Sequence, residues 1–362
     1  MSDFYIDVRM ISTSGIGTYI KNLVPLVIEK LPHMNIRLIG NQQELQRYSW
    51  TKNQRVTVVP CDAPIYSIQE QFDLYRIVPK DTVLWVPHYN IPVFRKGKMI
   101  VTIHDVLPLA MPQIIQGIHK KMYAEFMFNA VKRKANTIIC VSNFTKDQLK
   151  LYTGISDKKI TTIHLGVERA WFGMQKSQIS PYNKPYILYV GNVKPHKNLI
   201  RLIEAFDLIK GNIVHDLVVV GKKEGFITGD QLALEKASKI DGRVLFTGHV
   251  DDELLKQYFL HADMLIFPSL YEGFGLPPLE AMACGCPVIV SSSASLPEVC
   301  GDAAIYCDPN NTNDIAEKIL LVINDPGLKE KLRRKGIEHA SRFSWENCAE
   351  ETCGVIEKVI SC

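Results

Sequence analysis

The sequence contains no long apolar run. None of its apolar segments approaches the roughly 18 residues that a membrane-spanning helix requires. Its first ten residues, MSDFYIDVRM, lack a charged segment followed by an apolar one, so they do not predict a secretory signal peptide. These absences predict a protein that acts in the cytoplasm.

The chain also has little imbalance of charge. Its 42 Lys and Arg residues face 38 Asp and Glu residues, which gives a net charge of +4 over 362 residues. No block of basic residues interleaved with aromatic ones occurs, although nucleic-acid-binding proteins usually carry a basic face or motif. We therefore expect no nucleic-acid partner.

Patterns that bind metal ions are scarce as well. The cysteines number nine, and the closest pair, Cys284 and Cys286, forms C-x-C rather than the C-x-x-C of zinc sites. The chain has no D-x-D motif. Its Asp251-Asp252-Glu253 segment directly precedes a helix-period segment at 254–260, where capping is the expected role. The sequence thus predicts buried free thiols, no metal site and no other cofactor.

A repeated alternation of strand-like and helix-like segments is present. Short β-rich runs alternate with helix-period segments over 1–167 and again over 185–341, while 168–184 has no clear period and is predicted to be a linker. Residues 342–362 predict a C-terminal helix that could pack back on the first domain. This alternation is typical of α/β folds with doubly wound parallel sheets. Two such domains predict a ligand cleft between them.

The segment YEGFGLPPLEAMACGCPVI, at 271–289, places two carboxylates around a loop with two glycines and two prolines. The loop follows a predicted strand at 263–268, and α/β sheets bind ligands beyond such strand ends. A helix is predicted at 278–284, so Glu280 would lie in its first turn, where the helix dipole alone favours a carboxylate by about 0.3–1 kcal/mol. Glu272 has no cap or helix partner in the sequence. The spacing alone therefore leaves both a functional and a structural role open for each of the two glutamates.

Other candidate residues also stand near predicted strand ends. His104 ends an apolar strand, Lys197 precedes a helix, and Gly15 and Gly17 open the first helix of the chain. Each has an ordinary alternative: a structural histidine, a solvated lysine, and a glycine turn that lacks the rest of a dinucleotide-binding fingerprint.

Several segments together resemble one enzyme family. The segment EGFGLPPLE is similar to the E-x7-E motif of the retaining glycosyltransferases of family 4, which have the GT-B fold. In the family's order, SGIGTY at 14–19 resembles its Gly-rich loop, TIHDVLPL at 102–109 its central His segment, and YVGNVKPHKNL at 189–199 its phosphate-binding Lys segment. GCPVIVSSSASLPEVCGDAAIYCDP at 285–309 resembles the segment after E-x7-E. The resemblance covers most of the chain and implies two Rossmann-like domains.

The resemblance implies a role for each carboxylate and cation. Glu280 would accept hydrogen bonds from the donor's ribose, Glu272 would contact the hydroxyls of the donor sugar, and Lys197 would bind the diphosphate. Many members carry Arg where this chain has Asn192, so Lys194 is a candidate substitute cation.

The backbone and His104 complete the implied donor site. His104 would reach the donor sugar near the reacting carbon. The backbone N–H groups of the glycine-rich segments would bind sugar or phosphate, at Phe274, Gly275 and Leu276 and at Gly15 and Gly17.

The implied reaction is retaining, metal-independent transfer of a hexose from a nucleoside-diphosphate sugar to a hydroxyl of a glycan or lipid-linked glycan, in surface polysaccharide or lipopolysaccharide synthesis. The leaving phosphate oxygen would take the acceptor's proton on the same face of the sugar. GDP-mannose is the expected donor, and UDP- and dTDP-sugars stay open. The alternatives are a GT-B sugar-nucleotide epimerase or hydrolase and a non-catalytic sugar-binding protein.

The segment 113–134 combines apolar and basic residues at helical spacing. Its apolar residues are predicted to share one helical face: Ile114, Ile115, Ile118, Met122, Phe126 and Val131. Its basic residues are Lys120, Lys121, Lys132, Arg133 and Lys134. The segment is either a surface helix with its apolar face on a sheet, or a helix that makes peripheral contact with the anionic inner face of a membrane.

Overall fold

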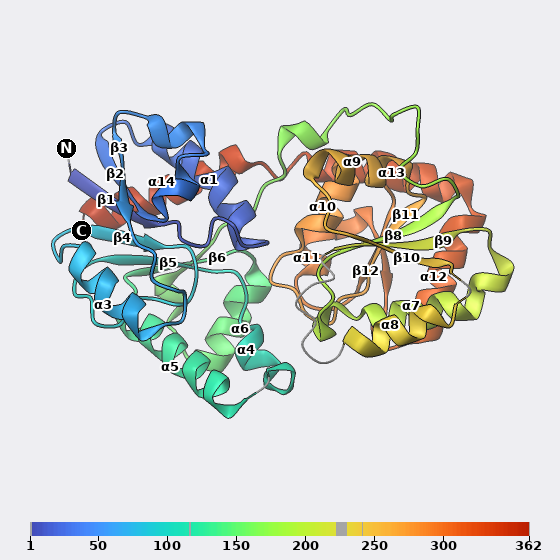
Figure 1. Cartoon of the computed structure of the whole chain (residues 1–362), viewed down its shortest axis with the longest axis horizontal. Helices are drawn as coiled ribbons and strands as arrows, with labels where there is room; N and C mark the ends of the chain where they lie inside the picture. The colour runs from blue at the N-terminus through green and yellow to red at the C-terminus, as the bar shows by residue number, and fades with distance from the viewer. Residues whose placement is uncertain (1, 116, 222–229, 241, 362) are drawn as a thin grey trace. The chain divides into compact units, whose positions relative to one another are not determined.

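The structure is a computed structural model that describes residues 2–115, 117–221, 230–240 and 242–361 (Figure 1). The chain forms two compact units. Unit 1 contains Met1–Gly166 and Ser344–Cys362, and unit 2 contains Val167–Phe343. Each unit is built around one parallel β-sheet, as the alternating sequence pattern predicts.

Unit 1 contains a seven-stranded sheet with the order β3-β2-β1-β4-β5-β6-β7, and every strand pair is parallel. Strands β4 and β5 are fully buried, as continuous apolar runs in a two-sided sheet should be. The strands are β1 (Ser2–Asp7), β2 (Met34–Gly40), β3 (Val56–Pro60), β4 (Val83–Val86), β5 (Met99–Ile103), β6 (Thr137–Cys140) and β7 (Ile160–Thr162).

Helices cover the sheet of unit 1. They are α1 (Ile16–Lys30), α2 (Gln42–Leu45), α3 (Ile68–Ile77), α4 (Leu107–Ala110), α5 (Ile118–Lys134), α6 (Asn143–Thr153) and α14 (Trp345–Ser361), with 3-10 turns at Ser49–Lys52, Pro112–Ile114 and Asp157–Lys159. The C-terminal helix α14 packs against α1, away from α3 and α5 (Figure 1). The last helix of the chain therefore completes the core of the unit in which the chain begins.

Unit 2 contains a six-stranded parallel sheet with the order β10-β9-β8-β11-β12-β13. The strands are β8 (Tyr186–Val190), β9 (Asp216–Val220), β10 (Val244–Gly248), β11 (Met264–Phe267), β12 (Val288–Ser291) and β13 (Ile305–Cys307). In the predicted linker stretch 168–184, a short 3-10 turn, Arg169–Trp171, belongs to this unit and packs Trp171 edge-on against Phe259.

Two helical layers cover the sheet of unit 2 (Figure 1). One contains α7 (Leu199–Ile209), α8 (Asp230–Ser238) and α12 (Thr312–Asn324); the other contains α9 (Asp252–His261), α10 (Leu276–Ala283) and α13 (Pro326–Ala340). The remaining pieces are α11 (Leu296–Cys300) and 3-10 turns at Pro195–Lys197, Lys210–Asn212 and Gly301–Ala303.

The strand order reverses once in each sheet, and this reversal decides where a ligand can enter. In unit 2 the reversal falls between β8 and β11, and in unit 1 between β1 and β4. Connections leave such a pair of strands in opposite directions and open a crevice beyond their carboxyl ends. A ligand site is therefore expected at the loops that follow these four strands.

All eight cysteines among the described residues are free, and seven of them are buried. Burial raises the pKa of Cys284 to about 12, so its thiol is protonated at neutral pH. The thiols are packing groups, as the sequence predicts.

Candidate donor site

An ion pair occupies the strand-order reversal of unit 2. Lys197 follows β8, Glu272 follows β11, and the lysine Nζ lies 2.6 Å from Oε1 and 2.9 Å from Oε2 of the glutamate. The side chains are 20% and 12% exposed, so the pair is partly withdrawn from water but still accessible. The ring of Phe267 lies below the ammonium group, with its centroid 5.3 Å from Nζ. The two residues stand 75 positions apart in the sequence, and the sheet brings them together.

The loop that carries Glu272 is held from several sides. The buried hydroxyl of Ser295 donates to the carbonyl of Glu272 at 3.0 Å and to that of Phe274 at 2.8 Å. The N–H of Leu270 donates to the carbonyl of His196, next to Lys197, at 2.7 Å. These bonds fix the backbone on both sides of the ion pair, so a ligand meets a preorganised loop.

The second glutamate of the segment lies on α10 and is unpaired. Glu280 is partly exposed, and its carboxylate has no hydrogen bond or ion pair to any described residue. Burial, with smaller contributions from the charges of Asp252 and Glu168, raises the pKa of Glu280 to about 8. A carboxyl group in this state can accept hydrogen bonds from a polyol, and such bonds would favour its ionised form.

The turn between the two glutamates depends on a glycine. Gly275 has φ 107°, precedes the first residue of α10, and leaves so little room that a Cβ would lie 2.8 Å from Cδ2 of Leu296. The helix begins at Leu276, and Pro277 and Pro278 follow in its first turn. Proline has no N–H, so these two positions offer no backbone donor to a ligand. Phe274, Gly275 and Leu276 each carry a backbone N–H group, and the next two residues carry none.

Lys194 differs from Lys197 in its setting. Its side chain is exposed and makes no ion pair with the described residues, while its carbonyl accepts the N–H of Lys197 at 2.9 Å. Between them, His196 is buried, and burial with the charges of Lys197 and Lys194 lowers its pKa to about 3. His196 is therefore neutral, and the positive charge of this turn comes from the two lysines.

In unit 1, His104 directly follows β5. Its Nε2 lies 3.0 Å from the carbonyl oxygen of Pro87, so Nε2 carries the proton and Nδ1 is left as an acceptor. Burial lowers the pKa of His104 to about 4, with Pro87 opposing and His88 reinforcing the shift. The imidazole packs edge-on against Tyr19, with ring centroids 4.9 Å apart. His104 is therefore a neutral, oriented group rather than a cation at physiological pH.

The two glycines at the start of α1 serve different structural needs, one in backbone conformation and the other in space. Gly15 has φ 63°, and a Cβ at this position would meet no atom within 4 Å. A Cβ on Gly17, in contrast, would lie 2.4 Å from the carbonyl oxygen of Ile11. The fold alone therefore requires Gly17, and Gly15 permits the turn into the helix. The first turn of α1 leaves N–H groups without acceptors in the helix, as every helix start does.

A buried polar cluster that no sequence motif predicts lies at the strand-order reversal of unit 1. Arg9 donates to Asp7 Oδ2 and to Glu70 Oε1, both at 2.6 Å, and both acids are fully buried. Nε2 of His88, after β4, lies 3.5 Å from Asp7 Oδ2. Although burial opposes ionisation, Arg9 and His88 hold the pKa of Asp7 well below its usual range. The only sequence signal is an Asp at the end of an apolar strand, because Glu70 lies 61 residues from Arg9.

The acidic segment at the start of α9 has the capping role that the sequence predicts. Oδ1 of Asp251 accepts the N–H of Leu254 at 2.8 Å, and Glu253 pairs with Lys256 at 2.7 Å. Within the described parts of the chain, no group of three or more His, Cys, Asp or Glu side chains could hold a metal ion.

Two family models match the chain. Residues 65–171 match the model for Glycosyltransferase Family 4, and residues 174–339 match that for Glycosyl transferases group 1. O-antigen chain mannosyltransferase B of Escherichia coli is 30% identical over 286 residues, which cover 75% of this chain and 73% of that protein. The chain belongs to the group 1 glycosyltransferases of the family 4 type. It is therefore a glycosyltransferase, and the predicted family is confirmed.

Another curated relative and two solved structures are also similar to the chain. The Serotype-specific mannosyltransferase WbdA of Escherichia coli is 28% identical over 292 residues, which cover 76% of this chain but only 34% of WbdA. Sucrose-phosphate synthase from Thermosynechococcus elongatus superposes with a TM-score of 0.78 at 18% identity, and covers 100% of both chains. Anabaena HepE in complex with UDP and glucose superposes with a TM-score of 0.79 at 15% identity, over 99% of this chain and 100% of that one. These structures confirm the GT-B fold.

Proposed function

We propose that this glycosyltransferase moves mannose from GDP-mannose to a hydroxyl of a glycan or lipid-linked glycan during surface polysaccharide synthesis, with retention of configuration and without a metal ion. Mannosyl transfer is supported by the names of the relatives, which include O-antigen chain mannosyltransferases of Escherichia coli and Salmonella typhimurium. The observation that carries the proposal is the Lys197–Glu272 pair at the strand-order reversal, with Glu280 eight residues further on.

Each of these three side chains would bind a different part of the donor. The ammonium of Lys197 would bind the diphosphate, the free carboxylate of Glu280 would accept the ribose hydroxyls, and Glu272 would accept hydroxyls of the mannose. In the free protein Glu272 holds Lys197 in place, so its ammonium group is already oriented when the diphosphate arrives. On binding, Lys197 exchanges part of its contact with the carboxylate for contact with phosphate.

Stabilising the departing GDP is the main electrostatic task. Negative charge grows on its terminal phosphate while positive charge grows on the anomeric carbon. Lys197 and the N–H groups of the 274–276 turn would stabilise the phosphate. A leaving phosphate oxygen would take the acceptor's proton on the same face, so the new bond forms where the old one breaks. His104, which is neutral and has Nδ1 as an acceptor, would lie near the anomeric carbon without adding positive charge there.

Unit 1 would bind the acceptor at the inner face of a membrane. No helix in the described residues is long and apolar enough to cross a bilayer. The helix α5 carries five basic residues and one acidic residue, which suits peripheral contact with anionic lipid.

A donor panel tests this function directly. Thermal shifts with GDP-mannose, UDP-glucose and a dTDP-sugar should be largest for GDP-mannose, because a bound ligand stabilises by RT ln(1 + [L]/Kd). Mannosyl transfer should persist in excess EDTA. A larger shift with a UDP-sugar would reject the donor, and activity lost in EDTA and restored by Mg²⁺ would reject metal independence. Sugar released without a glycoside product would indicate the hydrolase alternative.

Replacing the two lysines should separate their roles. We expect Lys197→Ala to lower donor turnover by about 1.5–3 kcal/mol, or roughly 10- to 150-fold, because a charge-assisted contact is lost. Lys194→Ala, the matched control in the same turn, should cost much less, because its side chain is exposed and makes no ion pair among the described residues. Steady-state kinetics with both variants provide the measurement. A larger loss for Lys194→Ala would contradict the assignment, and equal large losses would make Lys194 the substitute for the Arg absent at Asn192.

A further inference from the structure

Glu70 is a buried carboxylate that the donor chemistry does not use. It lies in the first turn of α3, and its side chain is fully buried. Its Oε1 accepts from Nη2 of Arg9, after β1, at 2.6 Å. Its Oε2 accepts from the N–H of Tyr66 at 2.8 Å and from Nδ2 of Asn90, after β4, at 2.7 Å. The carboxylate therefore ties α3 to two loops at the strand-order reversal of unit 1.

A buried ionic network of this kind is a weak source of stability. Glu70 and Asp7 are both fully buried, and Arg9 bonds to each of them at 2.6 Å. Moving a charged group out of water costs several kcal/mol, and apolar side chains of similar volume often stabilise a fold as well as a buried ion pair does. A buried network whose members are bonded does, however, rigidify the segments that it joins. The network therefore fixes the geometry of the two loops.

A short loop after β4 connects this network to His104. The N–H of Asn90 donates to Nδ1 of His88 at 3.2 Å, which folds the loop back on itself. The carbonyl of Pro87, at the start of the loop, accepts from Nε2 of His104 at 3.0 Å. This is the only hydrogen bond that the imidazole makes with the described residues. A shift of the loop would therefore move the bonding partner of the imidazole.

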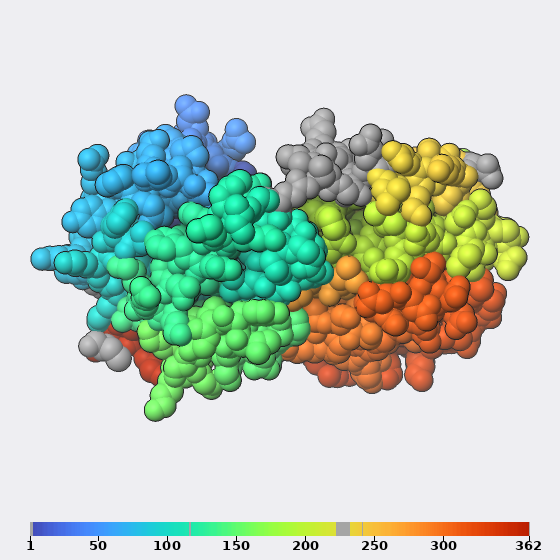
Figure 2. Space-filling model, turned by 90° about the horizontal axis from the view of Figure 1, so that it is seen from below, coloured from blue at the N-terminus to red at the C-terminus, as the bar shows by residue number. Residues whose placement is uncertain are grey.

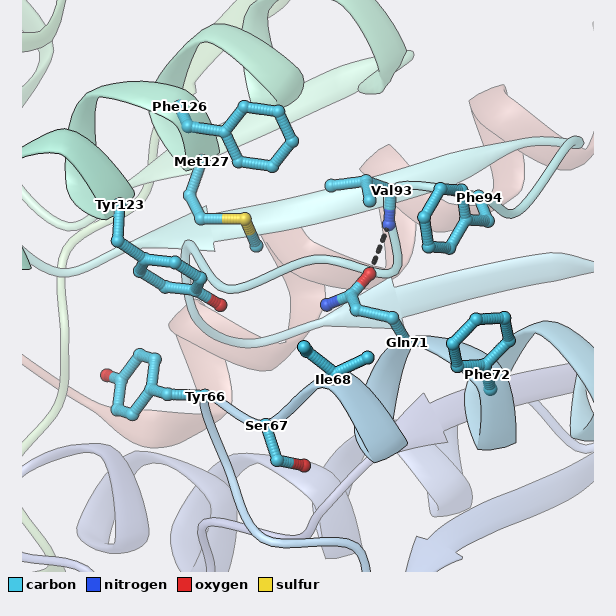
Figure 3. Close-up of a pocket in the computed structure, with 10 residues that line it drawn as sticks. All are labelled: Tyr66, Ser67, Ile68, Gln71, Phe72, Val93, Phe94, Tyr123, Phe126 and Met127. Carbon is cyan, nitrogen blue, oxygen red and sulfur yellow. Dashed lines mark hydrogen bonds between the residues drawn. The ribbon is translucent and has the colours of Figure 1, made fainter. Parts of the chain in front are cut away.

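Side chains from α3 and α5 hold the same loop. The two helices lie on one face of unit 1, where Figure 2 shows their light blue and teal segments, and an apolar pocket lies between them (Figure 3). The hydroxyl of Tyr123, on α5, donates to Oδ1 of Asn90. Gln71, on α3, accepts the N–H of Val93 at 2.7 Å and donates to the carbonyl of Ile91 at 3.2 Å (Figure 3). The loop is therefore anchored by side chains along its length.

We propose that Glu70 is a positioning residue for the transfer reaction: through Asn90 and the loop after β4, it fixes the orientation of the His104 imidazole. Glu70 itself would touch neither donor nor acceptor, because its carboxylate is fully buried and already accepts from Arg9, Tyr66 and Asn90. The place of His104 near the reacting carbon rests on the proposed function. The hydrogen bonds that connect Glu70 with His104 do not depend on it.

Nitrogen-15 NMR of histidine-labelled protein tests the positioning without any substrate. In the wild type, the Nε2 proton of His104 should give a resonance that exchanges slowly with water, because it is bonded to the carbonyl of Pro87. Its absence from His104→Ala assigns this resonance. In Glu70→Ala it should broaden or disappear, because the loop is released. Glu70→Gln should keep it, since the amide oxygen can still accept from Tyr66 and Asn90.

Kinetics should rank the variants in the same way. Assayed well below every melting temperature, Glu70→Ala should lower kcat about 10- to 100-fold, because a misplacement of about 1 Å can cost roughly 100-fold. Asn90→Ala, which breaks the same hydrogen bond from the other side, should give a similar loss. The affinity for GDP should change little, because Lys197 and Glu280 belong to unit 2. Glu70→Ala should cause little further loss in a His104→Ala background.

Arg95→Ala is the matched control for lost stability. Arg95 is 2% exposed and lies at the opposite end of the sheet, where β4 and β5 begin. Its guanidinium donates to the carbonyls of Pro79, Thr82 and Lys98. The variant should melt at a lower temperature, because these carbonyls lose their buried donor. Its kcat and its His104 resonance should match those of the wild type.

The outcomes separate positioning from a purely structural role. A His104 resonance that persists in both Glu70→Ala and Asn90→Ala would overturn the proposal. A loss of kcat in Glu70→Ala that adds in full to the loss in His104→Ala would also overturn it. If the resonance disappears but His104→Ala transfers sugar at the wild-type rate, Glu70 still positions His104, and the role proposed for His104 in the reaction falls.

Discussion

Glu272→Gln should retain the nucleotide and lose most of the transfer. We expect kcat to fall about 100- to 1,000-fold, the loss seen when one group that stabilises a transition state is removed. The reason is that contacts from Glu272 to the mannose hydroxyls would tighten as the sugar acquires positive charge. Glutamine keeps the shape and an acceptor oxygen for Lys197, so the loop should remain in place. Steady-state kinetics and GDP binding of the variant provide the measurement.

A double-variant cycle sharpens this prediction. Lys197 and Glu272 contact each other directly, so Lys197→Ala and Glu272→Gln should not be additive in transfer or in stability. Lys194→Ala combined with Glu272→Gln is the control, and its effects should add. A Glu272→Gln enzyme within twofold of the wild type would show that this carboxylate serves only to hold Lys197.

Donor binding should depend on pH through Glu280. Because burial raises the pKa of Glu280 to about 8, its carboxyl is largely protonated in the free enzyme at pH 6. Ribose hydroxyls bond better to the ionised form, so the affinity for GDP-mannose should fall by up to about tenfold per pH unit below 8. Titration calorimetry from pH 6 to 9 measures this dependence. Glu280→Gln should bind more weakly at pH 9, and its affinity should vary little with pH.

The same group makes an opposite prediction for the stability of the free protein. The folded protein holds the Glu280 proton more tightly than the unfolded chain, in which the pKa of this carboxyl is about 4.5. The contribution of Glu280 to the free energy of unfolding therefore falls as pH rises from about 4.5 to 8. The Glu280→Gln variant should not show this loss, and its melting temperature relative to the wild type should be higher at pH 8 than at pH 5. An affinity for GDP-mannose that is independent of pH in the wild type would argue against the ribose contact.

The architecture can be predicted well from the sequence because its signals are local. Alternating apolar strands and periodic helices specify parallel sheets, and the GT-B fold and family are confirmed. Boundaries are less accurate: the pattern predicts a helix from Pro278 to Cys284, whereas α10 runs over Leu276–Ala283. The difference is small because proline fits the first helical positions, so a Pro near the start does not fix which residue comes first.

The segment 113–134 differs from its prediction. The structure has a 3-10 turn at Pro112–Ile114, and α5 begins only at Ile118, after Gly117 with φ 93°; Gln116 lies outside the described residues. The predicted single apolar face is wrong. At 100° per residue, Val131 lies roughly 220° around the helix from Ile118. Val131 is buried, whereas Ile118 is 71% exposed.

Which distant residues meet cannot be predicted from the sequence. The Lys197–Glu272 pair and the Arg9–Glu70 pair join segments 75 and 61 residues apart, and only the tertiary fold brings them together. The raised pKa of Glu280 cannot be predicted from the sequence either, because it depends on how neighbouring elements bury the carboxyl group. The burial of a side chain and its contact partners depend on the tertiary structure, so the spacing of residues in the sequence does not predict them.

The anomeric configuration of the product tests the central claim most directly. The enzyme would be incubated with GDP-mannose, whose mannose is α-linked, in excess EDTA with a glycan acceptor, and the product would be characterised by NMR. We expect an α-mannoside whose formation requires the acceptor and is lost in Glu272→Gln. A β-mannoside, or free mannose without any glycoside, would contradict it.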